Sequence, residues 1–192
     1  NPYLKLSMTT NGGARKADFW EKMAASDVRV NFSVDGLEDT NHMYRQGVVW
    51  KNVEYSIDAF TSAGGKADWT FLVFNYNEHQ VEEAEQLSQS MGFERFQKKK
   101  SGRFILATGE KTKSQHQAQN RKKEKTTLIA EPIKLENKNL ALLKTKEIEK
   151  SYGSMKDYYD SCTIACKDVE KSEIFITAEG LLMPCCWTAG RM

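Results

Sequence analysis

The sequence predicts an α/β fold built on parallel strands. Over about the first hundred residues, short apolar strands alternate with amphipathic helices three times, and a fourth strand follows. Units of about 30 residues that alternate in this way connect parallel strands through right-handed crossovers. Glycines stand where the helices should end. The pattern fits either a doubly wound sheet or part of a (β/α) barrel.

The first strand and helix are predicted at the start of the chain. Residues Tyr3–Met8 largely alternate apolar and polar side chains, as a half-buried strand does, and the turn Thr10–Gly13 follows. Asp18 and Glu21 have the spacing of a capping box, which predicts a helix that opens at Asp18. The run Val28–Val34 is rich in residues that favour a pleated, buried surface, and it predicts the second strand.

Two more strand–helix units are predicted in the same way. Apolar residues at helical spacing predict a helix over Trp50–Phe60, which Gly64–Gly65 would end. The nearly continuous apolar run Ala67–Phe74 predicts a strand buried on both faces. Asn77 is predicted to cap the third helix, with Gln80 at the capping-box position.

The chain changes character after the fourth predicted strand, which starts at Phe93–Gln97. Residues 108–150 are rich in Lys, Gln, Asn and Glu and almost lack aromatic residues, which is typical of a polar linker. Farther on, Ile174–Ile176 and Leu181–Met183 flank a turn with Gly180, which predicts a hairpin. The expected organisation is an α/β domain (1–107), a Lys-rich linker (108–150) and a small Cys-containing β-hairpin domain (151–192).

The composition argues against two kinds of partner. A net charge of +2 gives no electrostatic reason to expect nucleic acid. The basic run Arg121–Lys125 is interrupted by Glu124 and has no interleaved aromatic residues. No apolar run approaches the length of a membrane span, and no signal-peptide pattern opens the chain. We therefore expect neither a nucleic-acid partner nor a membrane.

All four cysteines lie near the end of the chain: Cys162, Cys166, Cys185 and Cys186. This clustering favours a metal or cluster site in a reducing compartment, such as the cytoplasm, over a disulfide framework. Cys162 and Cys166 have the spacing of a zinc knuckle. Adjacent Cys185 and Cys186 fit a second knuckle badly, because neighbouring strand residues point to opposite faces. An iron–sulfur cluster is the first interpretation and zinc the second.

Polar residues follow the predicted strand ends, where parallel α/β folds gather their working residues. They include Thr10, Asn11, Ser33 and Asp35. Ser33 lies within an apolar strand, so its hydroxyl suits a hydrogen bond to a ribose or a similar ligand. Arg45, in the loop beyond, offers a fork for a carboxylate. The alternative interpretation is ordinary helix caps and loop residues.

At this point the sequence resembles a known family. Phe32–Gly36 followed by Arg45 resembles the "SxDG…R" segment of radical S-adenosylmethionine (SAM) enzymes with SPASM or Twitch auxiliary domains. Thr10–Gly12 is similar to their "TNG" turn after the third barrel strand. Gly180–Cys185 is similar to their "Gx4C" auxiliary-cluster hairpin, and Cys166 stands where the preceding cysteine is expected. The three motifs occur in the family's order.

The resemblance implies a partial (β/α)6, TIM-like half-barrel, of which this chain supplies strands three to six. Enzymes of this family reductively cleave SAM at a [4Fe–4S] cluster, and the resulting 5′-deoxyadenosyl radical abstracts a hydrogen atom from the substrate. The expected substrate is a peptide, a protein or a small metabolite, and the expected electron donor is a flavodoxin or ferredoxin. The implied SAM-binding residues are Ser33, Asp35 and Arg45, together with Thr10 and Asn11.

The resemblance also implies an auxiliary [4Fe–4S] cluster bound by Cys166 and Cys185, with Cys162 and Cys186 as further candidate ligands. The CxxxCxxC motif of the SAM-cleaving cluster is absent from the chain. We therefore expect that cluster to lie outside this chain, and enzymatic activity only in the full-length protein. The alternative function is a non-catalytic zinc- or cluster-binding α/β module.

Overall fold

The computed structural model describes residues 5–101, 104, 115–119, 125–130, 147–163, 170–177 and 180–183. The chain divides into two units, Asn1–Leu143 and Lys144–Met192, which are considered separately here. The division falls inside the segment 108–150 that the composition predicts to be a linker. In the described residues, no helix is both long and apolar enough to cross a membrane.

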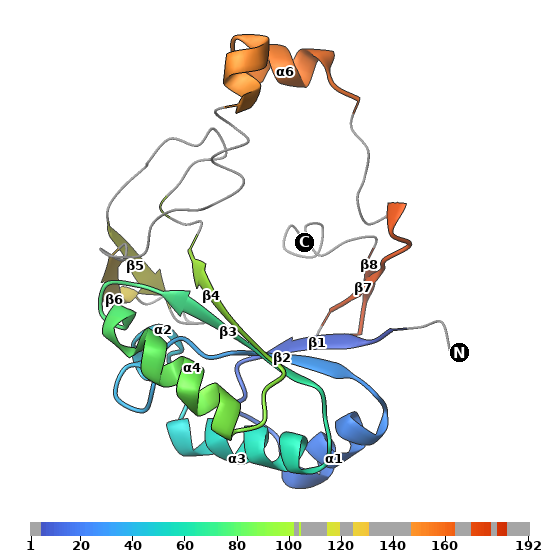
Figure 1. Cartoon of the computed structure of the whole chain (residues 1–192), viewed down its shortest axis with the longest axis vertical. Coiled ribbons are helices and arrows are strands. Elements are labelled where there is room, and N and C mark those ends of the chain that lie inside the picture. Colours follow the sequence, from blue (N-terminus) through green and yellow to red (C-terminus); the bar gives the residue numbers. More distant parts are fainter. Residues whose placement is uncertain are drawn as a thin grey trace. The chain divides into compact units, whose positions relative to one another are not determined.

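The N-terminal unit is built on a four-stranded parallel sheet with the strand order β1-β2-β3-β4 (Figure 1). The strands are β1 Ser7–Thr10, β2 Arg29–Ser33, β3 Ala67–Val73 and β4 Arg95–Lys100. The order in space equals the order in sequence, so right-handed crossovers place every connecting helix on one face. The predicted parallel α/β sheet is therefore confirmed. Its helices lie on one face, as in a barrel, whereas a doubly wound sheet carries helices on both.

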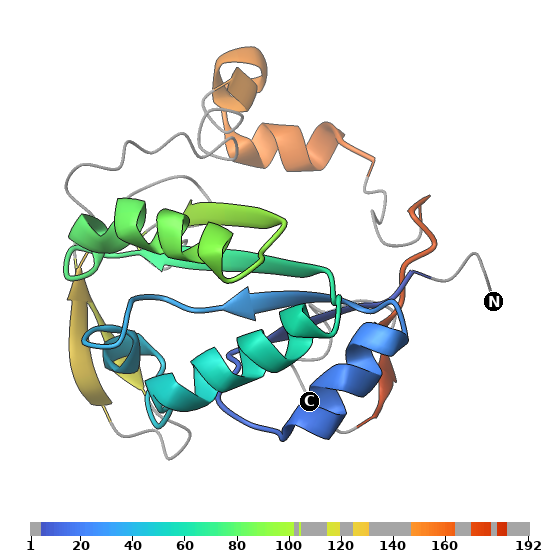
Figure 2. The ribbon, with the colours of Figure 1, turned by 60° about the horizontal axis from the view of Figure 1, so that its bottom comes forward.

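Helices cover one side of the sheet (Figures 1 and 2). The helical segments are α1 Ala17–Ala25, α2 Asn41–Tyr44, α3 Trp50–Ser62, the 3-10 turn η1 Glu78–Gln80 and α4 Val81–Ser90. Fully buried aromatic rings join helices and sheet: the ring centroid of Phe32 in β2 lies 5.5 Å from Trp20 in α1 and 6.1 Å from Phe60 in α3. Such burial is the main force that holds helices on a sheet.

The start of α1 differs from the prediction. The helix begins at Ala17 and has no side-chain cap, so Asp18 and Glu21 do not form a capping box. The N-cap residue is Lys16, whose side chain has no acceptor for the free N–H groups of the first turn. Asp18 is thus already in the first turn, where its carboxylate complements the positive end of the helix dipole.

The predicted linker contains an antiparallel hairpin of β5 Gln115–Gln119 and β6 Lys125–Ala130. Its end bonds to the loop after β3: the Asn75 backbone N–H donates to Ala130 O at 3.1 Å, and the Ala130 N–H donates to Asn75 Oδ1 at 3.3 Å. Polar composition favours a linker, but the β-branched residues of the Thr126–Ile129 run favour a strand. Here the structure differs from the linker expectation.

The C-terminal unit contains a helical segment over 147–152, the helix α6 Met155–Ser161 and a hairpin of β7 Phe175–Ile176 and β8 Leu182–Met183. Ser154 caps α6, since its Oγ accepts the Asp157 N–H at 3.1 Å. Gly180 stands in the hairpin turn with a left-handed φ of 85°, which glycine adopts without strain. The predicted hairpin is therefore present.

A salt-bridge network joins β2, β3 and β4 near their amino-terminal ends. The Asp68 Oδ1 atom lies 2.8 Å from Arg29 Nη1 and 3.4 Å from Arg95 Nε, and Arg29 Nη2 lies 2.6 Å from Glu94 Oε2. We expect Asp68→Asn to lower the free energy of unfolding by about 1 kcal/mol, because partly exposed ion pairs contribute little. Urea denaturation at low and high salt checks this, with the exposed Glu54→Gln as control. Equal losses at both salt concentrations would contradict an electrostatic origin.

Candidate functional site

The sheet face opposite the helices is polar. Side chains alternate between the two faces of a sheet, and Phe32, Trp69 and Phe96 pack into the core on the helix side. The residues between them therefore point to the other side, which we call the polar face. Its polar members are Ser7, Thr9, Arg29, Asn31, Ser33, Asp68, Thr70, Arg95, Gln97 and Lys99, and the apolar Leu72 lies level with Lys99 on the same face. The register sets Ser33 of β2 level with Thr70 of β3.

The carboxyl ends of the strands carry the five residues that the sequence predicts to bind a cofactor. Thr10 ends β1 and Asn11 follows it; Ser33 ends β2. Asp35 and Arg45 lie in the loop region beyond β2, at opposite sides of α2. Because the strands are parallel, all five belong to the same edge of the sheet. The structure brings two of them, Asp35 and Arg45, into direct contact.

Thr10 and Asn11 shape the turn after β1. Thr10 Oγ1 accepts the Gly12 N–H and Asn11 Oδ1 accepts the Gly13 N–H, each at 3.1 Å. Gly12 is buried and has a φ of 70°, and a Cβ there would lie 3.2 Å from the Phe32 ring. The turn thus requires glycine and is held by the two polar side chains before it.

Asp35 is the centre of the loop region beyond β2. Its side chain is fully buried. The Leu72 N–H donates to Asp35 Oδ1 at 2.7 Å, and Arg45 Nε lies 2.6 Å from Asp35 Oδ2. The Asp35 main chain is also bonded, since its N–H donates to Asn41 Oδ1 at 3.0 Å and its carbonyl accepts Asn77 Nδ2 at 2.8 Å. The Asp35 carboxylate is thus held by one hydrogen bond and one ion pair, and its main chain is fixed by Asn41 and Asn77.

Gly36 follows Asp35 because no other residue fits there. Its φ is 149°, in a region that L-residues rarely adopt. A Cβ at this position would also lie 2.7 Å from the backbone nitrogen of Asn41, which is too close for any real contact. The Asp-Gly pair of the sequence motif therefore builds the loop itself.

Two side chains that the sequence predicts to cap a helix instead tie the loops after β2 and β3 together. Asn77 makes no cap; its Oδ1 accepts the Phe74 N–H at 2.7 Å, and its Nδ2 donates to Asp35 O. Gln80 also makes no cap. Its Nε2 donates to Asp39 Oδ1 at 2.7 Å, and its Oε1 accepts the Leu37 N–H at 3.3 Å. Both are buried, which a helix cap at the surface does not require.

The Arg45 guanidinium is restrained at Nε and at Cζ, and its Nη donors remain for a ligand. Its guanidinium lies over the Tyr44 ring, with Cζ 5.2 Å from the centroid, and Tyr44 packs on buried Phe74 at 4.9 Å. The side chain is 25% exposed. Beyond the Asp35 pair, neither Nη atom of Arg45 makes a hydrogen bond or ion pair with any residue in the described ranges. The remaining donors can therefore bind an anion.

Tyr76 closes the same cluster. Its ring stacks on Phe74 with centroids 5.6 Å apart, and its hydroxyl is 3.5 Å from Asp35 O. Burial, and next the charge of Asp35, raise the pKa of Tyr76 well above its ordinary value. Tyr76 therefore stays a neutral donor at physiological pH. The sequence pattern predicts Tyr76 only as a hydrophobic staple onto Val81, because its contact with Asp35 joins residues 41 positions apart.

Ser33 is half-buried on the polar face, and its hydroxyl has no hydrogen-bond partner among the residues that the structure describes. Its neighbour Thr70 is different, since Thr70 Oγ1 donates to Asn31 Oδ1 at 2.9 Å. Of the five predicted residues, Asp35, Thr10 and Asn11 use side-chain oxygens to hold the loops, whereas Ser33 and Arg45 make no such loop-holding hydrogen bond in the described residues and keep donors for a ligand.

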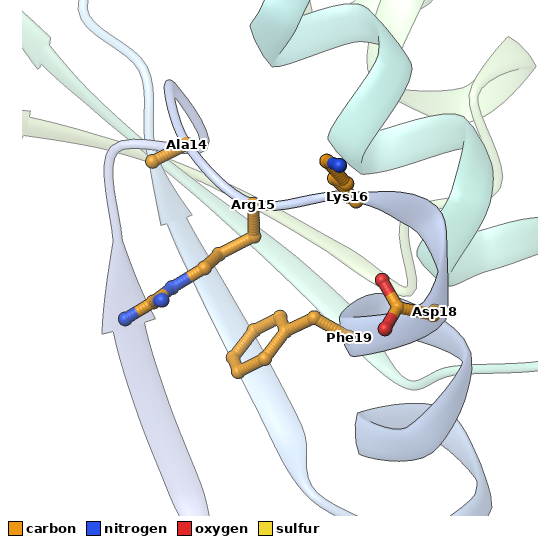
Figure 3. Close-up of a pocket in the computed structure, with 5 residues that line it drawn as sticks. All are labelled: Ala14, Arg15, Lys16, Asp18 and Phe19. Atoms are coloured by element: carbon orange, nitrogen blue, oxygen red, sulfur yellow. The ribbon is translucent and has the colours of Figure 1, made fainter.

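A surface depression lies beside the turn that follows β1 (Figure 3). Arg15, Lys16 and Phe19 line it, and the Arg15 Cζ lies 5.3 Å from the Phe19 ring centroid. Ala14 and Asp18 complete its lining. None of the five predicted residues lines this depression.

The predicted metal ligands fall mostly outside the described residues, which include only Cys162. Its thiol is partly buried at the end of α6 and is free, with Sγ 3.6 Å from Tyr159 O. Cys166, Cys185 and Cys186 lie outside the described residues. Among the described residues, no three His, Cys, Asp or Glu side chains are grouped so that they could hold a metal ion.

Comparison with known proteins gives a likeness of fold. No protein-family model matches the sequence, and no curated protein matches it. The crystal structure of SuiB from Streptococcus suis matches 97% of this chain and 45% of its own, with a TM-score of 0.52 and 14% identity. SuiB bound to the precursor peptide SuiA matches with a TM-score of 0.51 and 15% identity, over 97% of this chain and 44% of that chain. SuiB bound to S-adenosylmethionine matches with a TM-score of 0.51 and 12% identity, over the same shares of the two chains.

The chain therefore spans less than half the length of SuiB. At these identities the likeness concerns the fold alone: this chain has an α/β fold like that of the matching part of SuiB.

Proposed function

We propose that this chain is part of a radical SAM enzyme, in which β1–β4 are strands three to six of a (β/α)6 half-barrel. One observation carries the proposal: Phe32–Gly36 ends β2 and builds the loop that presents Ser33 and Arg45 at the carboxyl edge of a one-sided parallel sheet. The likeness to SuiB, which has been crystallised with S-adenosylmethionine, supports it.

The residues at this edge fit the polar parts of SAM. The Ser33 hydroxyl suits the ribose, and the Arg45 guanidinium suits the carboxylate, since each keeps donors without a partner among the described residues. Asp35, Thr10 and Asn11 would support the site by holding its loops. When bound at a [4Fe–4S] cluster, SAM would supply the radical that abstracts hydrogen. This chain's residues would bind and orient it and exclude water.

We further propose an auxiliary [4Fe–4S] cluster with Cys166 and Cys185 as ligands and Cys162 and Cys186 as candidates, on the basis of the sequence motif. SuiB is known in complex with a precursor peptide, which favours a peptide among the substrate classes. A flavodoxin or ferredoxin as electron donor and a cytoplasmic location belong to the same proposal, since reductive cleavage needs a reducing compartment.

In the full-length protein, Ser33→Ala and Arg45→Ala are expected to weaken SAM binding by about 1–3 kcal/mol each, the usual loss for a buried polar contact. Calorimetric SAM titration and the yield of 5′-deoxyadenosine under reducing conditions measure this. Ser90→Ala serves as the control, because Ser90 is exposed at the end of α4. Unchanged binding in both variants would remove the two residues from the site.

Anaerobic reconstitution of the full-length protein with iron and sulfide is expected to give more than about four irons per chain, because one [4Fe–4S] cluster holds only four. Replacing Cys166 and Cys185 by Ala should lower the iron content and spare the SAM-cleaving cluster. Zinc without iron, and no broad visible absorption, would instead favour the zinc-binding α/β module.

A further inference from the structure

We propose that Asp35 is a positioning residue that acts through Arg45: it holds the guanidinium in the orientation that receives the SAM carboxylate, and it does not touch the ligand. This inference rests on the proposed function, because the anion at Arg45 is taken to be that of SAM. It assigns the acidic residue of the "SxDG" segment a role different from that of Ser33, two residues before it.

The Asp35 carboxylate has no free surface with which to contact a ligand. The carboxylate is fully buried, and each oxygen already has a partner within the chain, the Leu72 N–H at 2.7 Å and Arg45 Nε at 2.6 Å. Its carbonyl oxygen is held by Asn77 Nδ2. A group with no accessible surface and both oxygens occupied cannot reach a ligand unless the loop opens.

The surroundings of Arg45 carry the second step. Contact at Nε and the Tyr44 ring beside Cζ restrain the long side chain from two directions. A free arginine loses much rotamer freedom when it binds an anion, and a restrained one loses less. Asp35 attracts only the Nε side of the guanidinium, so the two Nη donors remain as a fork for a carboxylate.

Two ligands distinguish a residue that positions Arg45 for the carboxylate from one that affects the whole binding site. S-adenosylmethionine has a carboxylate, whereas 5′-methylthioadenosine shares its adenosine and sulfur but lacks the amino-acid part. Asp35→Asn keeps the side-chain shape and an acceptor for the Leu72 N–H, and it loses the charge that holds Arg45. In the full-length protein, we expect it to raise the Kd for SAM about tenfold and to leave the Kd for methylthioadenosine within about twofold.

A double-mutant cycle provides the second readout. In the Arg45→Ala background, Asp35→Asn should have no further effect on SAM binding, because its only route to the ligand is gone. If the fold-increases in the Kd for SAM of the two single variants multiplied in the double variant, Asp35 would contact SAM directly. Asp35→Glu is a second variant that keeps the charge but displaces the guanidinium. This variant should also weaken the binding of SAM and leave the binding of methylthioadenosine unchanged.

Isothermal titration of the wild type and these variants with both ligands decides the matter. If the wild type does not bind SAM, the proposed function fails and this inference fails with it. If the wild type binds SAM and an Asp35 variant weakens the binding of both ligands equally, only the positioning role is overturned. Tryptophan fluorescence of each variant, reporting on buried Trp20 and Trp69, confirms that the compared proteins are folded.

Discussion

Asp35→Ala is expected to lower the free energy of unfolding by about 3–5 kcal/mol, the range for removing one partner of a buried ion pair. The substitution leaves the Leu72 N–H without its acceptor and Arg45 without its counter-ion. Because the Arg45 side chain is 25% exposed, water can recover part of its charge stabilisation, so the loss should lie near the lower limit. Urea unfolding followed by fluorescence of Trp20 and Trp69 measures it.

Glu38→Ala is the matched control for this variant. Glu38 is exposed and lies three residues from Asp35, so the same loop loses a carboxylate without losing a buried contact. Its effect should stay within about 0.5 kcal/mol. A comparable loss in both variants would mean that the loop tolerates no acidic-to-alanine change and that burial of Asp35 is not the cause.

Gly36→Ala is expected to destabilise the protein by about 2–4 kcal/mol, since two costs add. The first is a φ of 149°, which an L-residue adopts only under strain. The second is the approach of the new Cβ to 2.7 Å from Asn41 N, an atom of the backbone that can move only with its loop. The same unfolding experiment applies.

Gly47→Ala separates these two costs. Gly47 has a φ of 77°, but a Cβ there meets no atom within 4 Å. Its loss should therefore be about 1 kcal/mol, the cost of the backbone conformation alone. If Gly36→Ala were no worse than Gly47→Ala, the close approach to Asn41 would carry no energetic weight and the loop would be softer than its contacts imply.

The sheet could be predicted from the sequence because its signals are local. Apolar runs such as Ala67–Phe74 and the glycines at helix ends gave strands and helices within a few residues of their observed bounds. Parallel strands then follow from the strand–helix alternation, whereas the one-sided helices follow from crossover handedness only with the strand order that the structure supplies. The β5–β6 hairpin was missed because lysines and glutamines dominated the composition of that segment and outweighed the β-branched residues beside them.

The contacts of the site were less predictable. Asn77 and Gln80 match the capping-box rule, yet each bonds across about 40 residues of sequence to the loop after β2. A local rule sees only the nearest backbone donors, and tertiary partners can outcompete them. Ser33 and Arg45 could be proposed as binding residues because a serine inside an apolar strand and a motif arginine are visible in sequence, and that role stays a prediction. The partnership of Arg45 with Asp35 was not visible in the sequence.

Strand β4 ends the four-stranded sheet in the described part of the chain, and it carries three consecutive lysines, Lys98–Lys100. A bare sheet edge offers free backbone donors and acceptors to any other extended chain, which is a common route to aggregation. Two molecules that aligned their β4 edges would bring these ammonium groups together and repel each other. We therefore expect the run to disfavour such pairing, although Lys98 is partly neutralised by Glu85 at 3.7 Å. The effect should be strongest at low ionic strength, where like charges repel over the longest range.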